Sequence, residues 1–93
     1  MDIKQIYEEV ISLLASGNYQ NLRALLNEME PYDLALLCEE LSEAQLPIVF
    51  RLIAKDTAAE CFSEMSSDLQ ELLIRRMSDA ELKAVLDEMF IDD

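Results

Sequence analysis

Carboxylates are the commonest groups in this sequence that could do chemistry, because the 93 residues include 20 Asp and Glu but no His. Three pairs of them could suggest general acid–base work: Glu8-Glu9, Glu39-Glu40 and Asp87-Glu88. The members of each pair are adjacent in sequence, so on a helix they would point about 100° apart instead of converging on a substrate. We therefore interpret the pairs as solvated helix faces.

Other catalytic arrangements are also missing from the sequence. Without His, neither a Ser-His-Asp nor a Cys-His arrangement can be built, and two Cys alone are a poor basis for a zinc site. There is no Gly-rich phosphate loop, no nucleophile elbow and no H-E-x-x-H motif. We expect Cys38 and Cys61 to serve as small apolar core residues. The sequence predicts that the protein is not an enzyme.

The formal net charge of −13 limits the partners of this protein. Nucleic acid and anionic membrane surfaces both require Lys and Arg, so we exclude both as partners. The charge favours solubility, cations or a basic partner surface, and it does not choose among them. The longest apolar run, residues 34–38, is far shorter than the ~20 residues of a membrane span. With no signal peptide visible, we expect a soluble chain in a reduced, cytosolic setting.

Apolar residues return with a period of twelve, and this repeat predicts the elements that carry the carboxylates. Six successive units give twenty-four positions, of which twenty-three are apolar and one, Gln70, is polar. We call this set the apolar template: Leu22, Leu25, Leu26, Met29; Leu34, Leu37, Cys38, Leu41; Leu46, Val49, Phe50, Ile53; Ala58, Cys61, Phe62, Met65; Gln70, Leu73, Ile74, Met77; Leu82, Val85, Leu86, Met89. Twelve residues leave a helical stripe rotated by about 120°, so one long helix would spread it around its surface. The chain must therefore break once per repeat.

Helix-start signals fall at the expected breaks. Capping boxes of the form S-x-x-E/Q begin at Ser42, Ser67 and Ser78. Pro31 follows Glu30 at a first helical position, and Asp56 is expected to cap a helix that starts at Thr57. Pro47 fits less well, so that helix either starts late, near Ala44, or has a distorted first turn.

These signals predict one all-α domain over residues 1–93. The fold is a superhelical array of short helices with a ~12-residue repeat, preceded by a longer N-terminal helix. We expect a lead-in helix in residues 1–16, short-helix repeats in residues 18–89, and the start of a truncated repeat in residues 90–93. Helices of eight to ten residues are marginal alone and must stack on their neighbours. The truncated repeat suggests an excised domain of a larger protein.

One repeat position outside the apolar template is repeatedly acidic. It is held by Glu28, Glu40, Glu64 and Glu88, and interrupted by Leu52 and Arg76. In a stacked array such positions form a ladder on one surface, where carboxylates attract hard divalent cations. Mg²⁺ in particular keeps most of its waters and needs only one or two carboxylates. The alternative is a helical repeat whose acidic residues serve solubility only.

The segment from about Asn21 to Asp93 resembles the cytosolic N-terminal domain of MgtE-type magnesium transporters. Residues 22–34 match an LR..L.E..P.DL pattern of that family, and the likeness continues through residues 37–41, 58–60 and 78–82. It ends at residues 86–93, which resemble a LEEL.(L/P)DD run. The middle segment of a flagellar motor switch protein shares related helical architecture. A structural protein–protein interaction module of that type is therefore the alternative function.

The MgtE resemblance implies a regulatory domain that senses Mg²⁺ at the cytoplasmic face of the plasma membrane. The family has a right-handed superhelical N domain, a CBS module, a connecting helix and a transmembrane channel, and the full-length protein is a homodimer. Mg²⁺ ions bridge carboxylates of the N domain to acidic groups of the CBS module and favour the closed state. By this resemblance Asp92 and Asp93 match positions tied to those ions, and Glu60 is a weaker match. Helix capping is the alternative role for Asp92 and Asp93. Because the partner half of each site lies outside this chain, binding by the isolated domain is expected to be weak.

Overall fold

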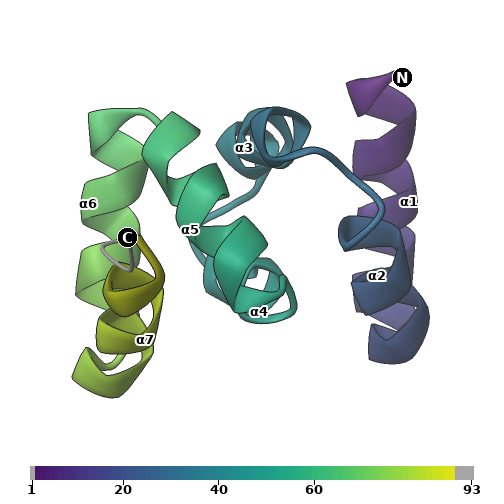
Figure 1. Cartoon of the computed structure of the whole chain (residues 1–93). Helices are drawn as coiled ribbons and strands as arrows, with labels where there is room; N and C mark the ends of the chain where they lie inside the picture. Colours follow the sequence, from purple (N-terminus) through teal and green to yellow (C-terminus); the bar gives the residue numbers. More distant parts are fainter. Residues whose placement is uncertain (1, 90–93) are drawn as a thin grey trace.

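The computed structural model describes residues 2–89, except for the side chains of residues 86, 88 and 89. Within residues 2–89 the chain forms seven α-helices (Figure 1). The helices are α1 (Ile3–Ser16), α2 (Tyr19–Leu26), α3 (Pro31–Glu40), α4 (Gln45–Arg51), α5 (Lys55–Glu64), α6 (Ser67–Arg76) and α7 (Asp79–Met89). Residues 2–89 contain no strand, so the all-α prediction is confirmed. The expected truncated repeat in residues 90–93 lies outside the described residues.

The helices follow one another across the molecule as an array (Figure 1). The odd-numbered helices pack in succession, α1 on α3, α3 on α5 and α5 on α7, while α4 packs on α6. The contact of α1 with α3 is less extensive than the two later contacts in this row. The array measures 36 × 25 × 24 Å. Each short helix thus gains its stability from at least one neighbour, as its length requires.

The first helix has well-defined ends. The Asp2 carboxylate accepts a hydrogen bond from the Lys4 backbone N–H (3.0 Å) at its start. At its end Gly17 takes a left-handed conformation (φ 71°), in which its N–H reaches the carbonyls of the last turn. Ile6 and Val10 form its buried stripe against the rest of the array. The predicted lead-in helix and its glycine stop are confirmed.

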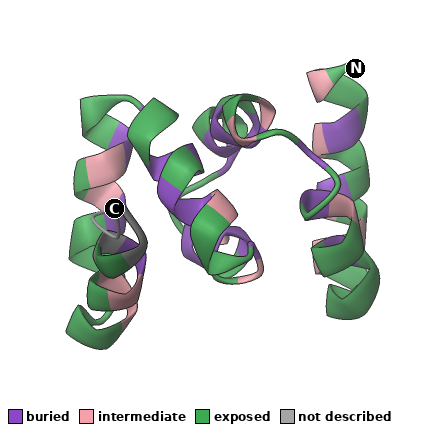
Figure 2. Ribbon diagram, viewed as in Figure 1, coloured by how far each residue is buried: buried purple, intermediate pink, exposed green. Residues whose placement is uncertain are grey.

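The apolar template forms most of the core (Figure 2). In the three units from Leu34 to Met65 every template position is buried. Gln70, the polar exception, is half-buried and donates a hydrogen bond from Nε2 to the Phe62 carbonyl (2.7 Å), so it fills its core-facing position while satisfying the end of α5. Ile74 is the one exposed template position among the described residues, at 52%.

Several predicted helix starts are confirmed. Pro31 is the first residue of α3. The boxes at Ser42 and Ser78 are both closed: each backbone N–H donates to the side chain three residues later (3.0 Å), and each hydroxyl accepts the N–H of that residue (3.2 Å). Helix α4 begins at Gln45, so it starts late, and Pro47 falls in its first turn, where no N–H is needed.

Two predicted helix starts are wrong. The box expected at Ser67 does not form, because Ser66 is the cap of α6 and its hydroxyl accepts the Leu69 N–H (3.3 Å). Helix α5 begins at Lys55, two residues before the predicted Thr57. Asp56 therefore lies inside the first turn, where its carboxylate accepts the N–H of the next residue (2.8 Å) and complements the positive end of the helix dipole.

Side chains from 27 residues upstream accept the backbone N–H of the N-cap residue of each of these two helices. The Ala54 N–H donates to Asn27 Oδ1 (3.0 Å), and the Ser66 N–H donates to Glu39 Oε2 (3.1 Å). Asn27 Nδ2 also donates to the Leu52 carbonyl (3.3 Å). Asn27 and Glu39 are twelve residues apart, so the same bond recurs from one repeat to the next. These long-range hydrogen bonds fix the register of the array as well as its turns.

Candidate functional site

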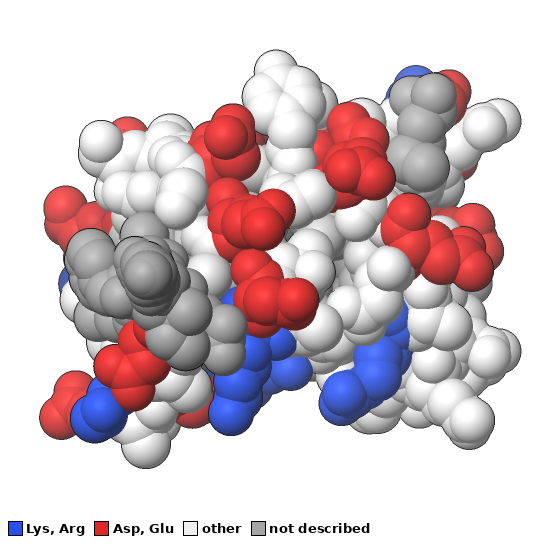
Figure 3. All heavy atoms as spheres, in the orientation of Figure 1, with Lys and Arg blue, Asp and Glu red and all other residues white. Residues whose placement is uncertain are grey.

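The outer face of α5 carries a row of carboxylates. Asp56, Glu60 and Glu64 follow one another at intervals of four residues, which places them on one side of the helix, and all three are exposed. Figure 3 shows acidic side chains as a band across this face over α5, with Lys and Arg gathered below it. Within residues 2–89 none of the three forms an ion pair. Like charges at this spacing repel each other.

The acidic ladder predicted from the repeat is exposed where the structure describes it. Glu28 follows the end of α2, Glu40 is the last residue of α3, and Glu64 is the last residue of α5. Neither α3 nor α5 has a basic residue in its last turn. A carboxylate at a helix C-terminus faces the negative end of the helix dipole, so these positions cost stability rather than add to it. The fourth member, Glu88, has no described side chain.

Of the three predicted metal residues, one lies within the described residues and two lie outside them. Glu60 lies on α5 and is exposed to solvent. Asp92 and Asp93 lie outside the described residues. Among residues 2–89 no group of three or more Asp, Glu, Cys or His side chains is arranged to hold a metal ion. Ion binding by Glu60, Asp92 and Asp93 therefore stays a prediction.

The two cysteines have the apolar role expected of them. Cys38 on α3 and Cys61 on α5 are fully buried and are free thiols. A hydrogen bond with Cys61, together with burial, raises the pKa of the Cys38 thiol well above its usual value. A thiol with a raised pKa is a poor nucleophile and a poor metal ligand. The pair contributes packing between α3 and α5.

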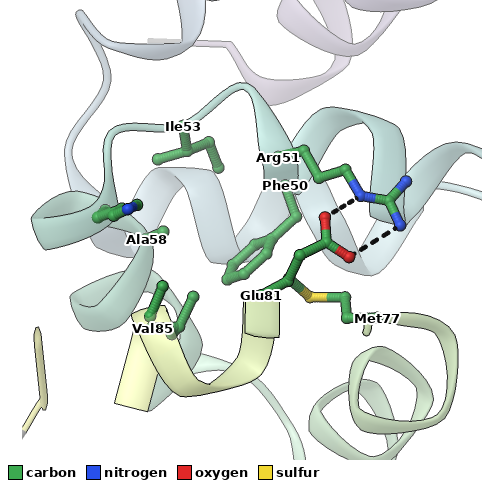
Figure 4. A pocket seen from close by; sticks show the side chains of 9 residues that line it. Phe50, Arg51, Ile53, Ala58, Met77, Glu81 and Val85 are labelled. Carbon is green, nitrogen blue, oxygen red and sulfur yellow. Dashed lines mark hydrogen bonds and ion pairs between the residues drawn. The ribbon is translucent and has the colours of Figure 1, made fainter. Parts of the chain in front are cut away.

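An ion pair between α4 and α7 borders a pocket (Figure 4). Arg51 donates from Nε to Glu81 Oε2 (2.5 Å) and from Nη2 to Glu81 Oε1 (3.2 Å). The two-pronged contact links residues 30 apart in sequence. Arg51 occupies the repeat position of Asn27 and Glu39, but it is a donor and cannot accept a backbone N–H. Glu81 therefore accepts both the Arg51 donors and the Ser78 N–H (3.0 Å).

This pair was not predicted from the sequence, although a signal for it exists. Arg51 stands twelve residues after Glu39 and twenty-four after Asn27, so the repeat puts a donor where two acceptors precede it. Such a switch calls for an acidic partner near the following turn. Glu81 meets that need, but from its sequence context it is only the last residue of a capping box.

The Arg51 contact predicts a pH-dependent contribution to stability. Hydrogen bonds from Arg51, and then from the Ser78 backbone, lower the pKa of Glu81 from its ordinary 4.5 to about 2. A group whose pKa is depressed by folding stabilises the fold above its unfolded pKa, and this contribution is lost as the pH falls. We expect urea unfolding of the wild type and of Glu81→Gln to differ most above pH 4.5 and to converge between about pH 4.5 and 2.

Substitution of the other member of the ion pair tests the same pH dependence. Arg51→Gln should reduce the pH dependence as Glu81→Gln does, and combining the two should add little further change. A difference in free energy of unfolding between wild type and Glu81→Gln that stays constant from pH 6 to pH 2 would contradict the expectation.

Comparison with known proteins assigns the family. The model of the MgtE intracellular N domain matches residues 29–93, which is more than half of the chain. The chain belongs to the MgtE intracellular N domain family. This is a family of transporter domains rather than of enzymes, and it favours the first of the two resemblances over the flagellar alternative.

A curated relative agrees with this MgtE assignment. The chain is 20% identical over all of its 93 residues to the magnesium transporter MgtE of Bacillus subtilis (strain 168). It spans 21% of the length of that protein. No helix within residues 2–89 is both long enough and apolar enough to cross a membrane. The part of the chain that matches the family model begins at Met29 and includes α3 to α7.

Proposed function

We propose that this chain is the Mg²⁺-sensing regulatory domain of a magnesium transporter. Ions shared between its carboxylates and acidic groups of a CBS module stabilise the closed state of the channel. Asp92, Asp93 and Glu60 are the residues proposed to contact these ions. The observation that carries the proposal is the exposed row Asp56, Glu60 and Glu64 on α5, which forms no ion pair within residues 2–89, in a chain that belongs to the MgtE intracellular N domain family.

The physical basis of sensing is repulsion that an ion relieves. Carboxylates are the ligands that Mg²⁺ prefers, and the ion binds through one or two of them while it keeps several waters. A single exposed row therefore supplies half of a site, and an opposing acidic surface supplies the other half. An ion that binds only the closed arrangement shifts the population toward that arrangement. When Mg²⁺ is scarce, the two acidic surfaces repel and separate.

The rest of the proposal concerns the full-length protein. Its partners are a CBS module and a transmembrane domain of the same chain, in a homodimer at the cytoplasmic face of the plasma membrane. The domain binds no nucleic acid, does not enter the bilayer and performs no catalysis. A gene that encodes neither a CBS pair nor hydrophobic spans after Asp93 would contradict the proposed partners.

Magnesium is expected to stabilise the isolated chain more than sodium does. At 10 mM MgCl₂ the midpoint of thermal unfolding should rise by about 2 °C beyond its value in about 30 mM NaCl, which has the same ionic strength. The difference is small because the partner half of each ion site is missing. Circular dichroism at the two salt conditions measures it.

A matched pair of charge variants separates ion binding from screening. Glu60→Gln with Glu64→Gln should remove the part of the magnesium effect that arises on α5. Glu8→Gln with Glu9→Gln removes the same charge from an exposed pair on α1 and should keep the effect. Equal midpoints in the two salts for the wild type would leave only screening and would count against an ion site.

A further inference from the structure

A pocket with apolar walls opens between α4, α5 and α7 (Figure 4). Its volume is about 180 Å³, and its lining includes the apolar side chains of Phe50, Ile53, Met77 and Val85. These four side chains are themselves nearly buried, so the walls belong to the core of the array. An apolar cavity of about 150 Å³ is large enough to bind benzene. The pocket therefore has room for one aromatic ring or a branched aliphatic group.

The described charged residues that line this pocket are mostly basic, whereas the protein as a whole is acidic. The chain has 20 acidic and 7 basic residues. Among the residues whose side chains the structure describes, the pocket is lined by Arg51, Lys55 and one acidic residue, Glu81. Both Glu81 oxygens are occupied by Arg51, so these two charges largely neutralise each other. Lys55 is exposed and forms no ion pair within residues 2–89. Counted over the described lining residues, Lys55 therefore leaves the pocket with one net positive charge.

We propose that this pocket binds a small carboxylate with a compact apolar body, such as an arylacetate. The ring lies against Phe50 and Val85, and the carboxylate lies at Lys55. The apolar body contributes through burial, and the carboxylate gains a charge-assisted hydrogen bond. Met77 has three rotatable bonds in its side chain and can adjust to rings of different shape.

The charge selects among ligands of one shape. A neutral alcohol with the same ring gains the burial but not the ion pair. An amine with the same ring brings a second positive charge next to Lys55. Asp56, the next residue along α5, does not line the pocket and so offers that amine no partner there. The order of affinity is therefore carboxylate, then alcohol, then amine.

The test is a titration of the ¹⁵N-labelled 93-residue chain followed by amide chemical shifts. Phenylacetate, benzyl alcohol and phenethylamine serve as the three probes, in buffer of constant ionic strength. Phenylacetate is expected to shift the amides of α4, α5 and α7 around the pocket with a Kd on the order of millimolar. Equal affinity for phenylacetate and benzyl alcohol would overturn the proposal, as would shifts spread over α1 and α2.

Variants then test the two parts of the site separately. Lys55→Gln should weaken phenylacetate binding about two- to fivefold and leave benzyl alcohol binding unchanged. Lys4→Gln removes the same charge from α1 and should change neither. Ala84→Leu places a larger side chain in the pocket lining and should abolish binding of both probes while the circular dichroism spectrum is kept. If Lys55→Gln and Lys4→Gln bind phenylacetate equally, the carboxylate does not lie at Lys55 and the proposal fails.

Discussion

Replacing Leu37 by alanine is expected to lower the free energy of unfolding by about 3–5 kcal/mol. Leu37 lies on α3 and is fully buried, and α3 packs against α1, α4 and α5. A cavity at this point removes the van der Waals contacts that the Leu37 side chain makes in the core. A domain of this size has a total stability on the order of 5–15 kcal/mol. The variant should therefore unfold more than about 10 °C below the wild type in thermal denaturation.

The neighbouring residue provides the control for this substitution. Leu36 is 38% exposed on the same helix, so Leu36→Ala removes the same atoms without opening a core cavity. Its cost should stay below about 1 kcal/mol. Urea unfolding of the two variants under one set of conditions compares them directly. Similar costs for Leu36→Ala and Leu37→Ala would mean that the twelve-residue template does not define the core.

The template predicts burial because it depends only on the period of the chain. Leu37 is buried and Leu36 is exposed, and the sequence assigns each to its side without any knowledge of neighbours. Ile74 is an exception to this prediction of burial. It is a template residue, yet it is half exposed, because it borders an open apolar pocket that it lines together with Leu82 and Val85 of α7. Burial at the end of an array depends on what packs there, and the period contains no such information.

Helix starts were predicted less well than helix faces, for a local reason. Ser66 and Ser67 are adjacent and can both cap a helix, so a shift of one residue leaves the sequence signal almost unchanged. Gln70 could have closed a box with Ser67, but its amide donates to the Phe62 carbonyl instead. That competing acceptor belongs to the preceding helix and is recognised only once α5 and α6 are placed.

The candidate site also combines features that the sequence can predict with features that depend on tertiary packing. The carboxylates of α5 could be assigned to an exposed face from sequence, because their spacing of four follows from helix geometry. The pocket beside Arg51 could not, because Arg51 and Glu81 are 30 residues apart and meet only through the packing of α4 and α7. The family match supplied what neither pattern contains, which is membership of the MgtE intracellular N domain family.

The second large effect is expected in the full-length transporter. If Asp92 and Asp93 are the ligands proposed above, Asp92→Asn combined with Asp93→Asn should raise the Mg²⁺ concentration that closes the channel at least about tenfold, because the loss of two charged ligands is expected to outweigh the repulsion that the substitutions remove. The substitutions keep the size and most hydrogen-bonding capacity of the side chains, so a capping role would be largely preserved. Mg²⁺ uptake into vesicles that contain the transporter, measured over a range of internal Mg²⁺, gives the closing midpoint. Glu8→Gln with Glu9→Gln is the control of equal charge and should keep the wild-type midpoint.

A charge reversal separates repulsion from simple loss of a ligand. If the acidic surfaces hold the open state apart, Asp92→Lys places a positive charge opposite acidic groups of the CBS module and supplies the attraction that Mg²⁺ normally provides. The channel should then close at low Mg²⁺, whereas the asparagine variants stay open. Channels that respond to Mg²⁺ as the wild type does in both variants would rule out Asp92 as part of the sensor. Loss of closure in both would mean that the carboxylate itself, and not the relief of repulsion, holds the closed state.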